Sequence, residues 1–295
     1  MLRVLLISCF AIGLLGQASA LAADDAYTLK LYKPKKGDKI EFEKTEESKN
    51  KVAISLAGMN NNQEILTGKK EAYIEEILEK KVGDQKPTRL TRTYSTSEKI
   101  EGKKSAKSVL AGKTVLIEKK REKFQFSIDG KEVDEKDAAD LSKSFNKPAD
   151  APDNEDLLPA EAVNVGGTWK VSADKAERMF KSLGEEKMKA DAQNSTIGGK
   201  LLKAYKKDGA QFGVIELTIT LFVTEIDLGG NFAKTKDGSK VVVKLTIDTC
   251  IDGTVHSEES KLEGTSDLSL DLLNNGSLVI NGTMSGLEKS RAAQK

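Results

Sequence analysis

The sequence is poor in the residue types that most catalytic and metal centres use. Its 295 residues include one histidine, two cysteines and one tryptophan. A zinc site usually takes several His, Cys or carboxylate ligands, and the sequence contains neither an H-E-x-x-H nor a C-x-x-C motif. The G-x-S-x-G turn of the α/β-hydrolases is absent too. The residues therefore predict no catalytic residue, no cofactor and no metal ion, and they favour a protein that is not an enzyme.

The sequence also lacks an excess of charge of either sign, with 47 basic and 46 acidic residues. A nucleic-acid-binding protein needs a basic surface that displaces counterions from phosphates. We therefore expect no nucleic-acid partner. Aromatic residues make up 5% of the chain and charged residues 32%, so we expect a well-solvated surface with few of the aromatic platforms that sugar clefts use.

Long apolar runs are absent except at the N-terminus. There Arg3 precedes an uncharged apolar run from Val4 to Leu15, and Ala18-Ser19-Ala20 forms a small-residue cleavage site. The run is too short for a membrane-spanning helix, which needs about 20 residues. We interpret residues 1–20 as a signal peptide. The mature protein is then expected to be soluble, without a transmembrane segment, in the periplasm or outside the cell.

Cysteine is too scarce for a disulfide framework. Leu6-Ile7-Ser8-Cys9 resembles a lipoprotein cleavage box, but the apolar run continues past Cys9 instead of ending there, which disfavours lipidation. Removal of the signal peptide leaves Cys250 alone, and a single thiol cannot form an intramolecular disulfide.

What the sequence does contain is alternation of apolar and polar residues, which predicts β-strands. The clearest run is Ile215 to Ile226, and Val241 to Ile251 repeats the pattern. Asp252-Gly253 and Asn275-Gly276 are hairpin turn signals, so this region is typical of an antiparallel meander. Further strands are expected at Tyr27–Lys33, from Ile40, at Lys113–Lys119, at Lys123–Ile128, and on either side of Asn275-Gly276.

Some segments have other patterns. Glu71–Val82 suits a helix or a strand, and we favour a strand because the turn signal Gly83-Asp84 follows. Gly58–Gln63 is expected to be a loop, and Glu185–Gly199 a mobile excursion. Two amphipathic helices are predicted, each with its own N-cap and apolar face. The first has Asp134, Ala138, Leu141 and Phe145, and the second has Ser172, Ala176, Met179, Phe180 and Leu183.

The centre of this organisation is Leu157–Val171, which holds Trp169 and follows a linker with two prolines and four acids. The segments that start at Gly37 and Gly166 share one pattern: a glycine, two small or polar residues, and then an apolar, a charged and an apolar residue. This shared pattern suggests a weak internal repeat. We therefore predict a mainly β (α+β) fold of antiparallel sheets, with two related half-barrel-like halves that each pack one helix. The expected parts are 24–148 for the first half, 149–158 for the linker, 159–288 for the second half and 289–295 for a frayed tail.

Two local motifs could carry chemistry. Gly112-Lys113-Thr114 resembles the end of a phosphate loop, but Lys107 stands where the first glycine should be, so we reject it. Cys250 and His256 flank the predicted turn at Asp252-Gly253, where they could form a nucleophilic dyad or half a metal site. The favoured interpretation is an exposed hairpin that happens to carry both residues.

Four features together resemble a family of exported bacterial proteins of unknown function, of the kind seen in planctomycete-like bacteria. They are the signal peptide, the Gly37-Asp38 strand entry, the hinge at 158–169 (Leu-Pro, then Val-x-Val-Gly-Gly-Thr-Trp) and the C-terminal meander. That family usually has Gly-Asp before Thr-Trp, where this chain has Gly166-Gly167. The resemblance implies an exported β-rich protein and transfers no catalytic residue.

Three functional hypotheses follow. The first is a non-enzymatic envelope or secreted binding protein that holds an apolar ligand such as lipid, using the apolar faces at 215–223 and 241–251, with lipid or an envelope protein as partner. The second is a hydrolase that uses scattered carboxylates, and the third is a purely structural interaction module. A roomy apolar cavity beneath the helices would favour the first, a cleft with paired acids the second, and a filled core the third.

Overall fold

The computed structural model describes residues 25–56, 59–81, 86–146, 152–184, 188–272 and 276–293. Several predicted features lie outside these ranges. They are the signal peptide with Cys9, the Gly83-Asp84 turn, Asn275, part of the linker, and, among side chains, that of Leu183.

The described chain is built mainly of long strands. The strands are β1 (Lys39–Leu56), β2 (Met59–Glu79), β3 (Arg89–Glu101), β4 (Lys104–Lys107), β5 (Thr114–Lys120), β6 (Lys123–Ile128), β7 (Lys131–Glu132), β8 (Thr168–Lys170), β9 (Met188–Ala190), β10 (Thr196–Lys207), β11 (Ala210–Asp227), β12 (Phe232–Lys234), β13 (Lys240–Cys250), β14 (Ser257–Leu272) and β15 (Gly276–Ala292). The helices are α1 (Glu135–Phe145), α2 (Ala173–Gly184) and the short 3-10 helix η1 (Asn154–Leu157). Neither α-helix has the length and apolar character needed to cross a membrane.

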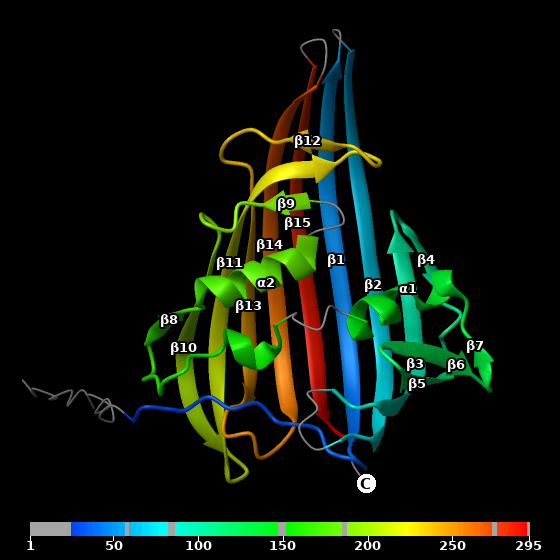
Figure 1. The fold of residues 1–295 in the computed structure, drawn as a ribbon, viewed down its shortest axis with the longest axis vertical. Coiled ribbons are helices and arrows are strands. Elements are labelled where there is room, and N and C mark those ends of the chain that lie inside the picture. The colour runs from blue at the N-terminus through cyan, green and yellow to red at the C-terminus, as the bar shows by residue number, and fades with distance from the viewer. Residues whose placement is uncertain are drawn as a thin grey trace, which may run out of the picture.

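These strands form one antiparallel sheet (Figure 1). Its main path runs β7-β6-β5-β3-β2-β1-β15-β14-β13-β11-β10-β8, and the sheet stays open, with β7 and β8 at its ends. The first long strand therefore lies beside the last one. Their register runs from Ile40 opposite Ala292 to Ser55 opposite Ser277. The predicted mainly β, antiparallel fold is confirmed, and the two expected halves are parts of one continuous sheet.

Both α-helices lie on one face of the sheet, which we call the helix face (Figure 1); the other is the open face. Ala138 and Leu141 of α1 pack into a cluster with residues of β2, β3, β5 and β6. Ala176 and Phe180 of α2 pack into a second, larger cluster with β10, β11 and the upper parts of β14 and β15. Both predicted helices are thus confirmed, although the Asp134 side chain makes no capping hydrogen bond.

Several segments differ from the prediction because contacts within the folded sheet override local composition. Tyr27–Lys33 is not a strand: it makes single bridges from Tyr27 to Val163 and from Lys30 to Asp252, and it crosses the lower end of the sheet (Figure 1). Met59–Gln63, expected to be a loop, is the start of β2, because β1 supplies a backbone partner for each residue. Glu71–Glu79 is strand, as favoured.

Three further expectations are corrected, two by strand pairing and one by a local capping motif. The expected excursion at 185–199 contains β9 and the start of β10, both paired with β11. The expected frayed tail continues β15 as far as Ala292, paired with β1. Within the expected linker, Asp153 and Asp156 form a capping box around η1, so this part is ordered by its own side chains.

The two segments that suggested an internal repeat adopt the same turn. Gly37 and Gly166 have φ angles of +88° and +86°, a region that favours glycine. Gly37 N–H bonds to Ile77 O and Gly166 N–H bonds to Leu201 O. The next residues, Asp38 and Gly167, accept the N–H of Ile77 and Leu201 in return. Each turn therefore docks on the neighbouring strand through the same pair of bonds.

Trp169 is a half-buried anchor of the second turn. Its Nε1 donates to Leu157 O at 2.9 Å, and its ring covers Gly199 on the paired strand β10. A Cβ at position 199 would lie 2.1 Å from Trp169 Cε2, so the ring position requires glycine there. The segment Gly198-Gly199 is strand because it pairs with β11 on one side and with β8 on the other.

We expect Gly199→Ala to lower the free energy of unfolding by about 1–3 kcal/mol because the new methyl group displaces the ring. Trp169→Ala should cost about 2–3 kcal/mol, below the range for a fully buried tryptophan. The double variant should cost no more than Trp169→Ala alone, as measured by urea denaturation. Gly198→Ala is the matched control, since only Trp169 O lies near its Cβ, at 3.7 Å. Strictly additive losses would contradict this account.

Candidate functional site

The structure does not bring together the Cys250–His256 pair considered from the sequence. Cys250 is 1% exposed and lies on the open face beside Phe212, and its Sγ donates to Asp252 Oδ1 at 3.0 Å. His256 lies on the helix face, where its Nε2 is 2.9 Å from Ser290 Oγ. The turn at Asp252-Gly253 places the two residues on different strands. They are not partners in the register of these strands, so their side chains point to opposite faces of the sheet.

The contact of His256 with Ser290 is a serine–histidine pair that the sequence analysis missed. His256 also packs against Tyr32 and Phe42, and burial lowers its pKa below the ordinary value, against the charge of Asp38. A nucleophilic serine also needs backbone donors for an oxyanion. Ser290 lies inside β15, between β1 and β14, where ladder bonds occupy the backbone donors. The pair is therefore better suited to packing than to catalysis.

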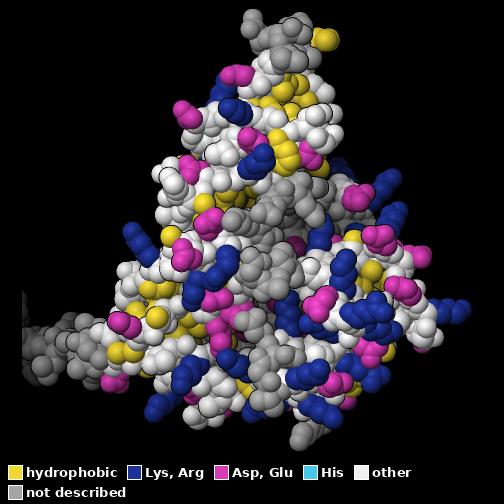
Figure 2. Space-filling model, in the orientation of Figure 1, with side chains coloured by type: hydrophobic (Ala, Val, Ile, Leu, Met, Phe, Trp, Pro, Cys, Tyr) yellow, Lys and Arg dark blue, Asp and Glu magenta, His cyan; other side chains and the backbone are white. Residues whose placement is uncertain are grey.

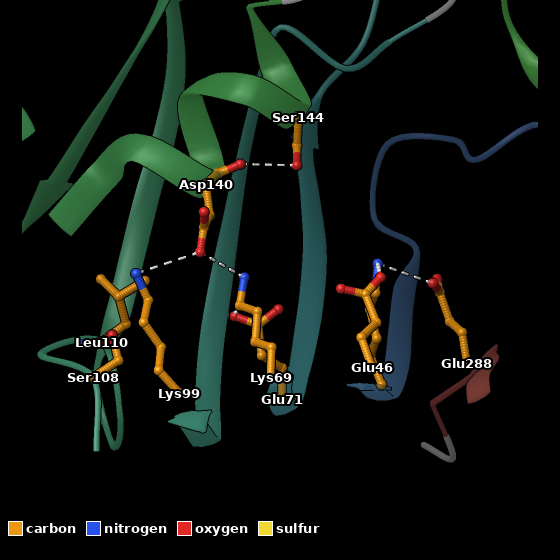
Figure 3. Close-up of polar contacts among 10 residues, drawn as sticks. Glu46, Lys69, Glu71, Lys99, Ser108, Leu110, Asp140, Ser144 and Glu288 are labelled. Carbon is orange, nitrogen blue, oxygen red and sulfur yellow. Dashed lines mark hydrogen bonds and ion pairs between the residues drawn. The ribbon is translucent and has the colours of Figure 1, made fainter. Parts of the chain in front are cut away.

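Between the two apolar clusters, the helix face carries a strip of ionic side chains (Figure 3). Lys44 Nζ lies 2.8 Å from Glu46 and 3.5 Å from Glu288. Lys69 Nζ lies 3.0 Å from Glu71 and 3.1 Å from Asp140, which belongs to α1. Burial disfavours the charged form of Lys69, but the two carboxylates more than offset this and raise its pKa. The strip thus ties α1 to the centre of the sheet.

Arg92 and Glu75 form the most buried ion pair of this face, with Nε 2.8 Å from Oε2 and side chains 15% and 12% exposed. The guanidinium lies 4.5 Å from the Tyr73 ring centroid and 4.9 Å from that of Phe145. Burial alone would lower the pKa of Arg92, but the surrounding groups raise it above the ordinary value. Through Phe145, the last residue of α1, this pair holds the C-terminal end of the helix on the sheet.

Glu258 is a further carboxyl group on the helix face. Burial, and then the charge of Glu288, raise its pKa to about 7. A carboxylic acid with a raised pKa is the pattern of a general acid, which is what the hydrolase hypothesis would need. Register places Glu258 between Thr249 and Ser290 in the middle of three paired strands.

A pocket of about 520 Å³ lies where the N-terminal segment crosses the sheet, and we call it the N-terminal pocket. It is formed by three segments that are far apart in the chain: residues 29–35, residues 155–159 and the turn at 252–253. Its lining residues are Leu29, Lys30, Leu31, Tyr32, Lys33, Lys35, Glu155, Leu158, Pro159, Asp252 and Gly253.

Specific contacts hold these three segments in place. Lys30 N–H donates to Ile251 O at 2.8 Å, and Lys33 Nζ lies 2.9 Å from Glu155. The hydrogen bond from Trp169 to Leu157 O fixes the residues before Leu158 and Pro159. Gly253 has a φ of +72°, and a Cβ there would lie 3.1 Å from Leu31 O. Glycine is therefore needed for the turn to approach the N-terminal segment.

The pocket is not where the sequence placed a cavity. Neither the N-terminal pocket nor a second pocket beside Tyr205 is lined by a residue of α1 or α2. The apolar faces at 215–223 and 241–251, expected to bind the ligand, are instead packed in the larger core cluster. The sequence showed the apolar and basic residues at 29–36, but a local pattern does not indicate that they meet Leu158 and Gly253.

The surface charge agrees with the balanced composition. Figure 2 shows basic and acidic side chains interspersed over the helix-face side of the molecule.

Comparisons with known proteins identify no family, since no family model and no curated protein matches the sequence. Among solved structures, one of lipovitellin has a TM-score of 0.41 at 10% identity and covers 88% of this chain but 26% of the lipovitellin chain. An outer membrane channel from Pseudomonas putida F1 has a TM-score of 0.23 at 9% identity, covering 92% and 99%. OprG from Pseudomonas aeruginosa has a TM-score of 0.18 at 9% identity, covering 89% and 100%. Likenesses of this size support no conclusion about this chain.

The Arg92–Glu75 pair makes a prediction about stability. Arg92→Met leaves Glu75 buried without its partner and should lower the free energy of unfolding by about 3–5 kcal/mol. The double variant Arg92→Met/Glu75→Leu removes both charges and should recover most of that loss. Guanidinium denaturation measures both, and a double variant less stable than Arg92→Met would be inconsistent with the pair's role.

Glu258 makes a prediction about pH. Its folded pKa of about 7 exceeds the ordinary value of 4.5, so the folded state holds a proton that the unfolded state releases between these values. Stability therefore falls as pH rises through this window. Glu258→Gln should raise stability by about 1–3 kcal/mol at pH 8 and leave it little changed at pH 4. Thermal melts at both pH values test this, with the exposed neighbour Glu259→Gln as control; an equal gain at both pH values would refute it.

Proposed function

We propose that this protein is an exported, non-enzymatic binding protein that holds an apolar ligand with an anionic head group in the N-terminal pocket. The observation that carries the proposal is the combination of an apolar wall and a lysine rim in one pocket. A fatty acid or an anionic lipid has this chemistry.

The apolar wall consists of Leu29, Leu31, Leu158 and Pro159. Leu29 is 7% exposed and belongs to the larger core cluster, so the wall is anchored in the fold. The volume of about 520 Å³ lies within the range of about 300–1,000 Å³ typical of small-molecule sites. An acyl chain against this wall would remove apolar surface from water, at about 25 cal/mol per Å².

The rim of the pocket is basic. Lys33 is neutralised by Glu155, whereas Lys30 and Lys35 form no ion pair within the described residues. The other acid of the lining, Asp252, accepts hydrogen bonds from Thr254, Cys250 and Gln211. Two lysines without an ionic partner beside an apolar wall favour a carboxylate or phosphate head group.

Export is part of the proposal and rests on the features of residues 1–20. Protein purified from its own host should begin near Leu21 or Asp24 if the signal peptide is removed. An N-terminus at a lipid-modified Cys9 would support the lipoprotein alternative instead.

A structural interaction module is the second candidate. The observation in its favour is the filled contact beneath the helices, where Ala138, Leu141, Ala176 and Phe180 are all buried against the sheet. Such a module would bind partners through its surface and would have no need of an occupied N-terminal pocket.

Ligand binding can be tested by fluorescence titration with dansyl-labelled undecanoic acid. The wild-type protein should bind, and Leu31→Glu should abolish binding because it places a carboxylate in the apolar wall. Lys35→Glu should weaken binding by about tenfold or more through loss of an ionic contact. Lys36→Glu changes charge equally on the same segment but outside the lining, so it is the matched control.

Native mass spectrometry of protein purified from its own host provides an independent measurement. A bound lipid or fatty acid that is absent from Leu31→Glu would support the proposal. A ligand-free protein that also fails to bind the dansyl probe would favour the interaction module.

A further inference from the structure

One edge of the sheet combines free backbone groups with a row of lysines. β8 ends the sheet on this side but pairs only with Gly198–Lys200 of β10 (Figure 1). The next residue, Leu201, exchanges backbone hydrogen bonds with Gly166 and Gly167. Beyond it, β10 has no outer strand partner among the described residues, and we call residues 202–207 the free edge. None of these residues lines the N-terminal pocket.

The contacts of β11 show which backbone groups of the free edge point outwards. Lys206 lies opposite Gln211 in the ladder. Gln211 bonds away from β10, because its N–H donates to Asp252 at 2.7 Å and its C=O accepts from Ile251 N at 2.8 Å. Bonding alternates along an antiparallel ladder, so Lys206 and Ala204 both direct their N–H and C=O groups away from β11. Within the described ranges, these groups have no hydrogen-bond partner.

The ionisable side chains of this edge are all basic. β8 and β10 contain no acidic residue, and their lysines, which we call the lysine row, are Lys170, Lys200, Lys203, Lys206 and Lys207. None of the row forms an ion pair in the part of the chain that the structure describes. Asp208, in the turn after β10, is the acid next to the row in sequence.

Acids on the neighbouring strands have other partners. Glu216 lies opposite Lys200, but its Oε2 is 2.6 Å from Lys244 Nζ. Asp248 accepts a hydrogen bond from the Tyr205 hydroxyl group at 2.6 Å. The edge therefore keeps an excess of positive charge, although the whole chain is nearly neutral.

Lysines and a bulge on an edge strand protect a sheet against unwanted pairing. β10 has both, since its register shifts between Leu201 and Lys203. A second copy of this edge would bring like charges together, and an apolar strand would remove the lysines from water without giving them a partner. A strand that carries carboxylates bonds to the outward backbone groups and also pairs with the lysines. The features that repel other strands therefore select an acidic one.

We propose that the free edge binds an extended acidic segment of a partner protein, which joins the sheet as an additional strand. The outward groups of Ala204 and Lys206 hold its backbone. Its carboxylates, on alternate residues, face Lys203 and Lys207 on the open face. The segment is short, because the turn at 166–167 closes the edge above it. This contact does not depend on a ligand in the N-terminal pocket.

Fluorescence anisotropy with a fluorescein-labelled octapeptide of alternating glutamate and valine tests the proposal. The wild-type protein should bind this peptide, and binding should weaken as the salt concentration rises. Two control peptides separate charge from backbone pairing. A peptide with lysine in place of glutamate has the wrong charge, and the glutamate peptide with an N-methylated backbone keeps the charge but cannot donate hydrogen bonds. Neither should bind.

The protein variants test the same two contacts from the other side. Lys203→Glu/Lys207→Glu should weaken binding of the glutamate peptide by about tenfold or more, because two attractive contacts become repulsive. Ala204→Pro should weaken it by a similar factor, because proline removes an outward N–H and its ring lies where the added strand approaches. Lys240→Glu is the control, since it reverses an exposed charge on β13, inside the sheet.

Circular dichroism confirms that each variant is folded, and if Ala204→Pro is not, the N-methylated peptide tests the backbone contact alone. The proposal is overturned if the wild-type protein does not bind the glutamate peptide, if the lysine peptide binds as tightly, or if Lys203→Glu/Lys207→Glu binds like wild type. Equal loss of binding in Lys240→Glu would overturn it too. Equal binding of the N-methylated peptide would show that charge alone suffices, as for an anionic membrane surface, and would exclude strand addition.

Discussion

The pairing of β1 with β15 is the contact on which the rest of the structure depends. It places Ile40 opposite Ala292, so nearly the whole described chain lies between the two partners. Without it, the cluster under α1 and the cluster under α2 would belong to separate sheets with exposed edges. Pairing of residues so far apart requires a large loss of chain entropy, which the long ladder and both clusters together must offset.

The ionic strip on the helix face fits this central position. Lys44 of β1 reaches Glu288 of β15, and Lys69 of β2 reaches Asp140 of α1. These ion pairs are partly exposed, so each adds little net stability, but a shift in register would separate all of the partners at once. We infer that the strip fixes the register of strands whose centre has little apolar surface, while the apolar clusters on either side supply most of the stabilisation.

The two pockets lie where the long sheet meets segments that do not follow it, or where its strands end. The N-terminal pocket exists because residues 25–38 cross the sheet and meet the turn at Gly253. The second pocket, beside Tyr205, is lined by residues of six neighbouring strands, from β1 to β10. Both sites therefore depend on long-range contacts, and the strongest apolar strands, β11 and β13, contribute mainly to the core.

The local features of this protein could be predicted from its sequence alone. Alternation of apolar and polar residues predicted β11 and β13, and the spacing of apolar residues predicted α1 and α2. The sequence also showed the matching segments at Gly37 and Gly166, which make the same pair of hydrogen bonds to a neighbouring strand. These features depend on near neighbours and on backbone preferences, which sequence patterns record. The fold was needed to show that Lys289–Ala292 is strand, that Ser290 meets His256 and that Leu31 meets Leu158 in a pocket, because each of these depends on partners far away in the chain. Met59–Gln63 pairs with the nearby residues Val52–Leu56, and there the energy of the long ladder outweighs the poor strand propensity of three asparagines.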